Sequence, residues 1–305
     1  MSTRPPFRGV LCPITTPFDA VTGDPAPVPL RAHVRELLDG GVHGVLVAGS
    51  TGEAALLSDD EFHQVVGWVR DVVPADRTLL VGTGRESTRA TIAACRAAGE
   101  LGADGVLVRA PSYYGSSLGA AALLEHLRRV ADGSPVPVIL YNIPKYTHVA
   151  LPDQMLAALA SHENVIGAKD SSADLKNFAA YTAAVPGWAH FIGSATLFYA
   201  ALELGAVGGI LGIANVAPAL ALEVWDRWDA GDRAGAGAVQ ERLGPLNRLV
   251  VGELGVPGVK AAMDLVGRHG GPVRAPLVGL GARDRERVAA ALREAGVSAA
   301  APQGA

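Results

Sequence analysis

Cysteine is scarce in this sequence of 305 residues, which contains only Cys12 and Cys95. Two cysteines cannot build a disulfide framework. The N-terminus also lacks a basic segment that leads into an apolar stretch, so we expect a reducing, cytosolic setting. An excess of cations is missing too, because 26 basic residues oppose 30 acidic ones. This balance argues against nucleic acid as a partner.

The sequence also lacks the common metal and nucleophile motifs. Its eight histidines are scattered, and it contains no HExxH, CxxC, GxSxG, Walker or dinucleotide-binding fingerprint. We therefore expect no metal ion and no Ser-His-Asp triad. A long hydrophobic run is missing as well. The stretch 204–222 is free of charge but contains several glycines, Asn215 and Pro218. Two buried elements separated by a turn explain it better than a membrane span, which stays the alternative.

Hydrophobic residues are abundant, at 49% against 18% charged, and can fill a large core. Short apolar runs alternate with longer alanine-rich stretches of helical period, a pattern typical of a parallel α/β fold. Most runs are apolar at successive positions, as strands covered on both faces are. The expected strands are 10–15, 44–47, 78–81, 105–108, 136–141, 165–169, 190–192 and 208–211. The expected helices are 30–39, 59–73, 87–101, 118–131, 152–161, 174–184, 196–204 and 217–230.

Eight strands with eight following helices favour a (β/α)8 TIM barrel, and an open doubly wound sheet is the alternative. We expect the barrel in residues 1–233 and a C-terminal helical appendage in residues 234–305. In such a barrel the active site lies at the carboxyl ends of the strands. Polar residues at those ends are therefore the candidates for catalysis.

Lysine is rare, and one of the four lysines stands on an apolar run. Lys169 ends the expected strand 165–169, whereas the others are Lys145, Lys176 and Lys260. Burial disfavours the ammonium form, so part of this amine would be neutral and nucleophilic near neutral pH. The alternative is a lysine at a strand end that simply reaches water or pairs with Asp170.

Hydroxyl groups follow two other expected strands. The segment 49–53 (GSTGE) could offer N–H groups and the hydroxyls of Ser50 and Thr51 to a carboxylate or phosphate, although a tight turn also explains its glycines. Tyr141 could pass protons to a substrate oxygen, or could be a core residue with a satisfied hydroxyl. The Tyr113–Tyr114 pair is open between pocket, core and subunit contact.

Three segments in this order, 49–53 (GSTGE), 141–144 (YNIP) and 167–172 (GAKDSS), resemble the dihydrodipicolinate synthase/N-acetylneuraminate lyase superfamily. The similarity covers nearly the whole chain, from 9–18 (GVLCPITTPF) to 270–277 (GGPVRAPL). Members are pyruvate-type Schiff-base aldolases on a (β/α)8 barrel. The resemblance implies a small-molecule 2-oxo acid substrate, no cofactor beyond a covalent lysine imine, and a cytoplasmic homotetramer built as a dimer of dimers.

The resemblance also implies roles for individual residues. Lys169 would be the amine that condenses with the ketone of the 2-oxo acid, and Tyr141 the general acid/base. Ser50 and Thr51 would hold the substrate carboxylate and relay protons. Tyr114 would be a relay tyrosine contributed across a subunit interface. Further pocket residues would be Ser171, Gly193 and Ile210.

The substrate is harder to choose within this superfamily. The segments 169–172 (KDSS), 84–88 (GREST), 205–209 (GAVGG) and 270–277 look like 4-hydroxy-2-oxoglutarate aldolases, which is our leading interpretation. Dihydrodipicolinate synthases carry an arginine shortly after YNxP, where this chain has Tyr146. The aldolases often show Asn in place of Thr51, so a dihydrodipicolinate synthase, a sugar-acid aldolase and a 2-keto-3-deoxy acid dehydratase stay alternatives. A catalytically silent barrel that binds 2-oxo acids is less favoured, because the lysine, the tyrosine and the hydroxyl pair are all present.

Overall fold

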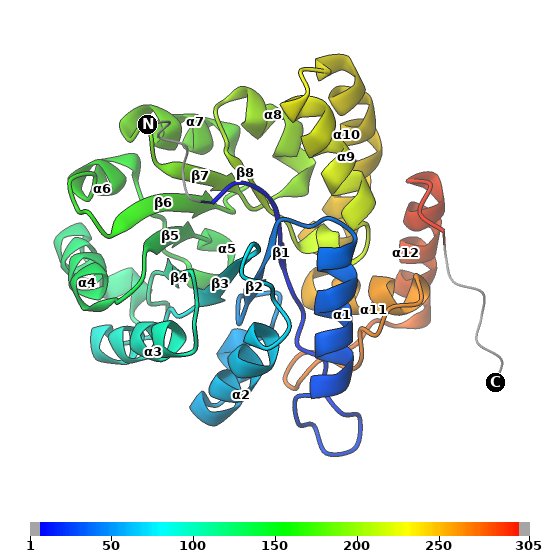
Figure 1. The fold of residues 1–305 in the computed structure, drawn as a ribbon, viewed down its shortest axis with the longest axis horizontal. Helices are drawn as coiled ribbons and strands as arrows, with labels where there is room; N and C mark the ends of the chain where they lie inside the picture. Colours follow the sequence, from blue (N-terminus) through cyan, green and yellow to red (C-terminus); the bar gives the residue numbers. More distant parts are fainter. Residues whose placement is uncertain (1–6, 299–305) are drawn as a thin grey trace.

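Eight parallel strands close into a barrel in the computed structural model, which describes residues 7–298 (Figure 1). Each strand pairs with the next along the chain, and the eighth pairs back with the first. The strands are β1 Gly9–Pro13, β2 Gly44–Val47, β3 Thr78–Gly82, β4 Gly105–Arg109, β5 Val138–Asn142, β6 Val165–Asp170, β7 Ala189–Ile192 and β8 Gly208–Ile210. The predicted TIM barrel is confirmed, and the open sheet is excluded.

Helices follow the strands and cover the outside of the barrel (Figure 1). One difference from the prediction lies after β5, where a one-turn helix that begins at a proline precedes the expected helix. The α-helices from the first to the one that follows β8 are α1 Pro27–Asp39, α2 Asp59–Arg70, α3 Thr88–Glu100, α4 Ala120–Gly133, α5 Pro144–Thr147, α6 Asp153–Ala158, α7 Leu175–Ala184, α8 Phe198–Glu203 and α9 Pro218–Asp229. A turn this short carries no 3.6-residue period that sequence reasoning could detect.

Two apolar layers explain why the strands are apolar at successive positions. Leu11, Leu46 and Leu80 belong to a cluster inside the barrel. Val10 and Val45, their neighbours along the same strands, pack in the larger cluster that the strands share with the helices. Side chains alternate between the two faces of a strand, so both faces of this sheet are buried. A polar side chain directed into the barrel is therefore held away from water.

The charge-free stretch 204–222 forms short elements, as expected. It contains β8, a short 3₁₀ helix, Gly212–Asn215, and the first part of α9. Within residues 7–298, no helix is long and apolar enough to cross a membrane.

Within residues 7–298, the chain after α9 forms helices and no strand, and residues 266–281 lie outside any helix. Helix α10 Arg233–Asn247 packs against α9, and a π-helical segment, Arg248–Glu253, leads into α11 Gly255–Leu265. Helix α12 Ala282–Glu294 packs against α10 and α11. Figure 1 shows these helices gathered on the side of the barrel where β8 meets β1. The π-helical segment and the start of α11 thereby come to the carboxyl ends of the strands.

A buried ion pair ties α11 to the loop that follows β2. Nζ of Lys260 lies 2.6 Å from Oε1 of Glu53, and both side chains are almost completely shielded from solvent. The same ammonium donates hydrogen bonds to the carbonyls of Thr16 and Pro272, each at 2.7 Å. The other carboxylate oxygen accepts the amide of Arg274 at 2.8 Å. Burial lowers the pKa of Lys260, and the Glu53 carboxylate opposes that shift. Three segments far apart in sequence are thus joined by one charge pair.

Replacing Lys260 with methionine is expected to lower the free energy of unfolding by about 3–5 kcal/mol, because the Glu53 carboxylate stays buried without its counter-charge. The matched control is Arg31→Met. Arg31 also pairs at 2.6 Å, with Asp71, but these side chains are 35% and 62% exposed, so the loss should stay below about 1 kcal/mol. Urea denaturation measures both. Losses of equal size would contradict the structural role of the buried pair.

Candidate active site at the carboxyl ends of the strands

A cavity of about 220 Å³ lies at the carboxyl ends of the barrel strands. It is smaller than the roughly 300–1,000 Å³ typical of drug-sized ligand sites, so a small acid suits it. Seven of the eight residues that the sequence predicted line it: Ser50, Thr51, Tyr141, Lys169, Ser171, Gly193 and Ile210. They follow or end β2, β5, β6, β7 and β8, whose carboxyl ends meet at one edge of the barrel. Tyr114 does not line the cavity.

Register brings the central lysine and tyrosine together. Tyr141 of β5 and Lys169 of β6 are register partners, so their side chains leave the same face of the sheet. Tyr141 belongs to the apolar cluster inside the barrel. Nζ of Lys169 lies 4.4 Å from the centre of the Tyr141 ring. The amine and the phenol thus share one wall of the cavity.

Lys169 has no carboxylate partner within residues 7–298, and its side chain is only 4% exposed. The neighbouring Asp170 accepts hydrogen bonds from the side chains of Asn142 (2.8 Å), Ser172 (2.8 Å) and Asn177 (3.1 Å). The alternative in which Lys169 pairs with Asp170 is therefore excluded. Burial alone lowers the pKa of Lys169 to about 7, which leaves a large neutral fraction at physiological pH.

Tyr141 is held as a protonated phenol near two serine side chains. Burial raises its pKa, and the side chains of Ser171 and Ser50 offset part of the rise. A phenol in this state can donate a proton at neutral pH. The serine hydroxyls provide a route along which that proton could move. The alternative, in which Tyr141 is a core residue with a satisfied hydroxyl, explains why Tyr141 is buried. It does not explain why Tyr141 also lines the cavity.

The loop between β2 and α2 offers two backbone amides to the cavity. It is bounded by two non-glycine residues with left-handed backbone, Ala48 (φ 52°) and Glu53 (φ 56°). The carbonyl of Ser50 accepts the Glu53 amide at 3.2 Å, which closes a tight turn. Within residues 7–298, the amides of Ser50 and Thr51 donate to no acceptor. The segment is therefore a tight turn that also leaves two N–H groups and two hydroxyls free for an anion.

Gly193 allows close packing around the lysine. A Cβ atom at this position would collide with Oγ of Ser171 and would lie 3.1 Å from Cε of Lys169. A larger residue here would displace the Ser171 hydroxyl and crowd the lysine. Ile210 is fully buried and belongs to the apolar cluster inside the barrel. These two residues shape the floor of the cavity around the amine.

Tyr114 lies on the surface of the single chain. It is 69% exposed, and its ring meets the 80% exposed Tyr113 edge to face, with 4.9 Å between ring centres. The structure therefore does not bring Tyr114 to the lysine within one chain. Its predicted role across a subunit interface stays a prediction.

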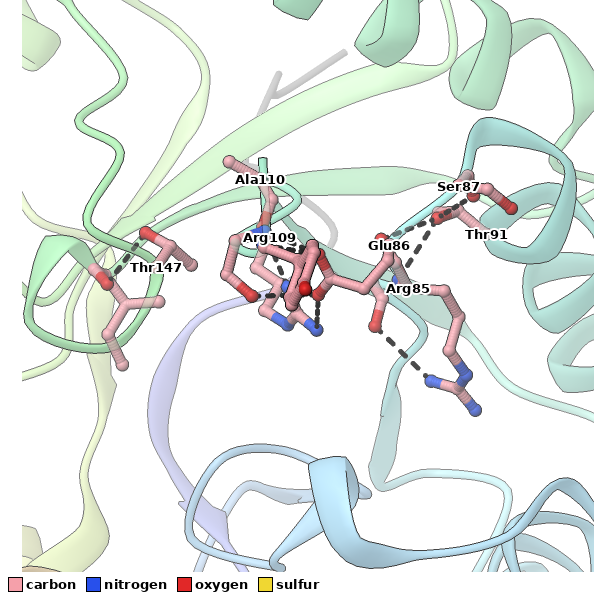
Figure 2. Close-up of polar contacts among 11 residues, drawn as sticks. Arg85, Glu86, Ser87, Thr91, Arg109, Ala110 and Thr147 are labelled. Carbon is pink, nitrogen blue, oxygen red and sulfur yellow. Dashed lines mark hydrogen bonds and ion pairs between the residues drawn. The ribbon is translucent and has the colours of Figure 1, made fainter. Parts of the chain in front are cut away.

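Glu86 fixes the loop that carries this tyrosine pair (Figure 2). One carboxylate oxygen accepts the amides of Ser112 and Tyr113, each at 2.8 Å. The other accepts the Ser112 hydroxyl and Nη2 of Arg109, each at 2.9 Å. Burial raises the pKa of Glu86, but these hydrogen bonds outweigh it and lower the pKa to about 2. The carboxylate is thus ionised, and it holds the loop over the whole physiological range.

Residues that sequence reasoning did not assign form the rest of the wall. Lys145 comes from α5, and its Nζ donates to the carbonyl of Gly252 at 2.7 Å. Asn247, Val251 and Val256 come from the C-terminal helices. The rarity of lysine was a signal for Lys145, but its position after YNIP gave no sign that it lines the cavity or bonds to Gly252. The C-terminal residues had no motif that could have revealed them.

A second, outer hollow of about 730 Å³ adjoins the inner cavity. The residues that line both are Ser50, Tyr141, Lys145, Tyr146, Gly255 and Val256, and Arg109 lines only the outer hollow. Lys169 lines only the inner cavity. Within residues 7–298, no group of three or more His, Cys, Asp or Glu side chains is placed to hold a metal ion.

Comparison with known proteins agrees with this geometry. The model of the Dihydrodipicolinate synthetase family matches residues 6–295. An uncharacterized DapA-like lyase of Halobacterium salinarum is 38% identical over 95% of both chains. A protein of Emericella nidulans named "Probable 4-hydroxy-2-oxoglutarate aldolase, mitochondrial" is 35% identical over 97% of this chain and 96% of that one. The crystal structure of a chloride-inhibited dihydrodipicolinate synthase of Acinetobacter baumannii complexed with pyruvate has a TM-score of 0.91 and 30% identity, and covers 95% of this chain and 99% of that one.

Replacing Lys169 with methionine is expected to raise the free energy of unfolding below pH 7. This gain over wild type should shrink as the pH rises above 7. The folded pKa of about 7 lies below the ~10.4 of an unfolded lysine, so between these values the unfolded state binds more protons. Wild-type stability should therefore rise relative to the variant by up to about 1.4 kcal/mol per pH unit in that window.

Urea denaturation at pH 6, 7, 8 and 9 measures this difference. The control is Lys176→Met, on the exposed surface of α7, for which we expect no such slope. A stability difference between wild type and Lys169→Met that stays constant from pH 7 to 9 would contradict the lowered pKa.

Proposed function

This chain belongs to the dihydrodipicolinate synthetase family of carbon–carbon lyases, and we propose that it cleaves or forms a 4-hydroxy-2-oxo acid through an imine on Lys169. The favoured substrate is 4-hydroxy-2-oxoglutarate, which cleaves to pyruvate and glyoxylate. The observation that carries the proposal is the buried amine of Lys169, whose pKa is lowered to about 7 and which has Tyr141 beside it. A structural lysine gains nothing from this position, because burial destabilises its charged form.

The reaction begins with the neutral amine. Nζ of Lys169 attacks the C2 carbonyl, the carbonyl oxygen leaves as water, and a protonated imine forms. Tyr141 supplies the proton that the departing oxygen needs. The Tyr141 phenolate left by that step then removes the proton of the C4 hydroxyl, and the electrons of the C3–C4 bond move into the imine. Glyoxylate leaves as the aldehyde, Tyr141 returns the proton to the enamine at C3, and water hydrolyses the imine to release pyruvate.

The rest of the cavity positions the substrate for these steps. The free amides and hydroxyls of Ser50 and Thr51 suit the C1 carboxylate, since charge-assisted hydrogen bonds to a carboxylate are strong. Ser50 and Ser171 line the cavity with Tyr141, so their hydroxyls would connect the proton donor to the carboxylate site. Gly193 keeps space next to the amine, where the imine carbon would stand.

Assembly is part of the proposal. The exposed Tyr113–Tyr114 pair, whose loop Glu86 holds, supports a contact with another copy of the chain. We propose a cytoplasmic homotetramer in which Tyr114 reaches the neighbouring subunit and relays protons to its Tyr141. The same fold and lysine also serve a dihydrodipicolinate synthase, a sugar-acid aldolase or a 2-keto-3-deoxy acid dehydratase, so the substrate has to be decided by assay.

Trapping tests the imine. After incubation with pyruvate and reduction with borohydride, mass spectrometry should find a pyruvyl adduct on Lys169 and none on Lys176. Lys169→Ala should form no adduct and have no turnover. Tyr141→Phe keeps the amine and should reduce turnover by about 10²–10⁴-fold, as expected for loss of a general acid/base. A wild-type protein without the adduct would overturn the proposal.

Two assays separate the substrates. Pyruvate release from 4-hydroxy-2-oxoglutarate should exceed, in kcat/KM, the condensation of pyruvate with aspartate semialdehyde, because Tyr146 stands where synthases carry an arginine for a substrate carboxylate. Both assays use the same preparation, and the borohydride adduct gives the fraction of active sites. Turnover only with aspartate semialdehyde would make the chain a synthase.

A further inference from the structure

The inner cavity carries positive charge that no acidic residue on its wall balances. Its lining contains two lysines, Lys169 and Lys145, and no aspartate or glutamate. Lys169 lies on β6 and is buried, and Lys145 lies on α5 and is exposed to solvent. The two lysines therefore mark the interior of the cavity and its mouth. A substrate joined to Lys169 as an imine would have the Lys145 ammonium group near its other end.

Lys145 has unused hydrogen-bonding capacity. Within residues 7–298 it forms no ion pair, and its Nζ donates only to the carbonyl of Gly252, at 2.7 Å. An ammonium group has three N–H donors, so two remain for a ligand. The bond to Gly252 anchors the group at the π-helical segment, which lines the cavity through Val251 and Gly252. Lys145 is thus a positioned charge without a counter-charge.

The other cations near the mouth are already engaged. Nη2 of Arg109 binds Glu86 at 2.9 Å, and Arg85 lies 3.7 Å from Asp59. Both arginines line only the outer hollow. Lys145 lines both hollows, so it is the cation that stands between them. An anionic group at the outer end of a substrate bound in the inner cavity has this one partner of opposite charge within the described chain.

We propose that Lys145 binds a second carboxylate at the far end of the substrate, and thereby selects 2-oxo dicarboxylic acids over 2-oxo acids with a neutral end. This inference rests on the proposed function, because the first end of the substrate is placed by the Lys169 imine and by Ser50 and Thr51. It names Lys145 as a specificity residue. Tyr146, the next residue, contributes a neutral phenol at the same place.

Charge removal at Lys145 tests the proposal with two substrates that differ at one end. These are 4-hydroxy-2-oxoglutarate and 4-hydroxy-2-oxopentanoate, which has a methyl group in place of the outer carboxylate. For Lys145→Met we expect kcat/KM to fall about 10- to 100-fold for the diacid, because a loss of this size is usual for one charged hydrogen bond. The change should come chiefly from a higher KM. The methyl-ended substrate should change less than about threefold. Lys145→Arg should recover most of the diacid activity, and Lys176→Met should change neither substrate.

The outcomes separate this inference from the proposed function. Equal losses with both substrates would show that Lys145 supports the fold of the cavity and does not bind the outer carboxylate. Unchanged activity with the diacid would show that Lys145 does not contribute to binding it. Either result overturns the inference. The borohydride adduct on Lys169 is measured in the same Lys145→Met preparation. An adduct without selective loss refutes the role of Lys145 alone, whereas its absence in wild type refutes the imine and this inference together.

Discussion

The ion pair between Glu53 and Lys260 is the contact on which the arrangement of the cavity depends. It holds the end of the loop that offers Ser50 and Thr51, and it fixes α11 against that loop. Because α11 follows directly on the π-helical segment, the pair also sets the position of the Gly252 carbonyl and, through it, of Lys145. The barrel supplies the buried amine of Lys169, and the C-terminal helices complete the wall of the cavity around it. The two parts of the chain thus make one site.

Burial lowers the pKa of Lys169 and costs stability at the same time. The strand places the amine inside a barrel whose other inward residues are largely apolar, so the charged form loses hydration without gaining a carboxylate. Lys260 is buried to a similar degree, yet Glu53 and two carbonyls compensate its charge. The same residue type is therefore a paired structural charge in one place and an unpaired amine, suited to the proposed imine, in the other. The presence or absence of a counter-charge decides which.

The fold and the inner half of the site could be predicted because strands and their ends leave local signals. Eight apolar runs indicated the barrel, and Lys169 stood out as a rare amine on one of them. Lys145 was visible as a lysine, but its role depends on Gly252, more than a hundred residues away in sequence. Helix α5 is too short for a periodic signal, and the π-helical segment has none of its own. Tyr114 illustrates another limit, since one chain alone leaves it on the surface.

Successive side chains of β6 point to opposite faces of the strand, and this separates the Lys169 amine from the Asp170 carboxylate. The proposed chemistry relies on that separation. Lys169 and Asp170 are adjacent, so one side chain enters the cavity and the other leaves on the opposite face, where three side chains bind it. A register slip of one residue would exchange them and put a carboxylate in the cavity. That carboxylate would raise the pKa of a nearby lysine and repel an anionic substrate. The amide of Gly193 donates to the Asp170 carbonyl at 2.7 Å, and the Ser171 amide donates to Asn142 at 2.8 Å. These bonds continue the sheet beyond β6 and oppose such a slip.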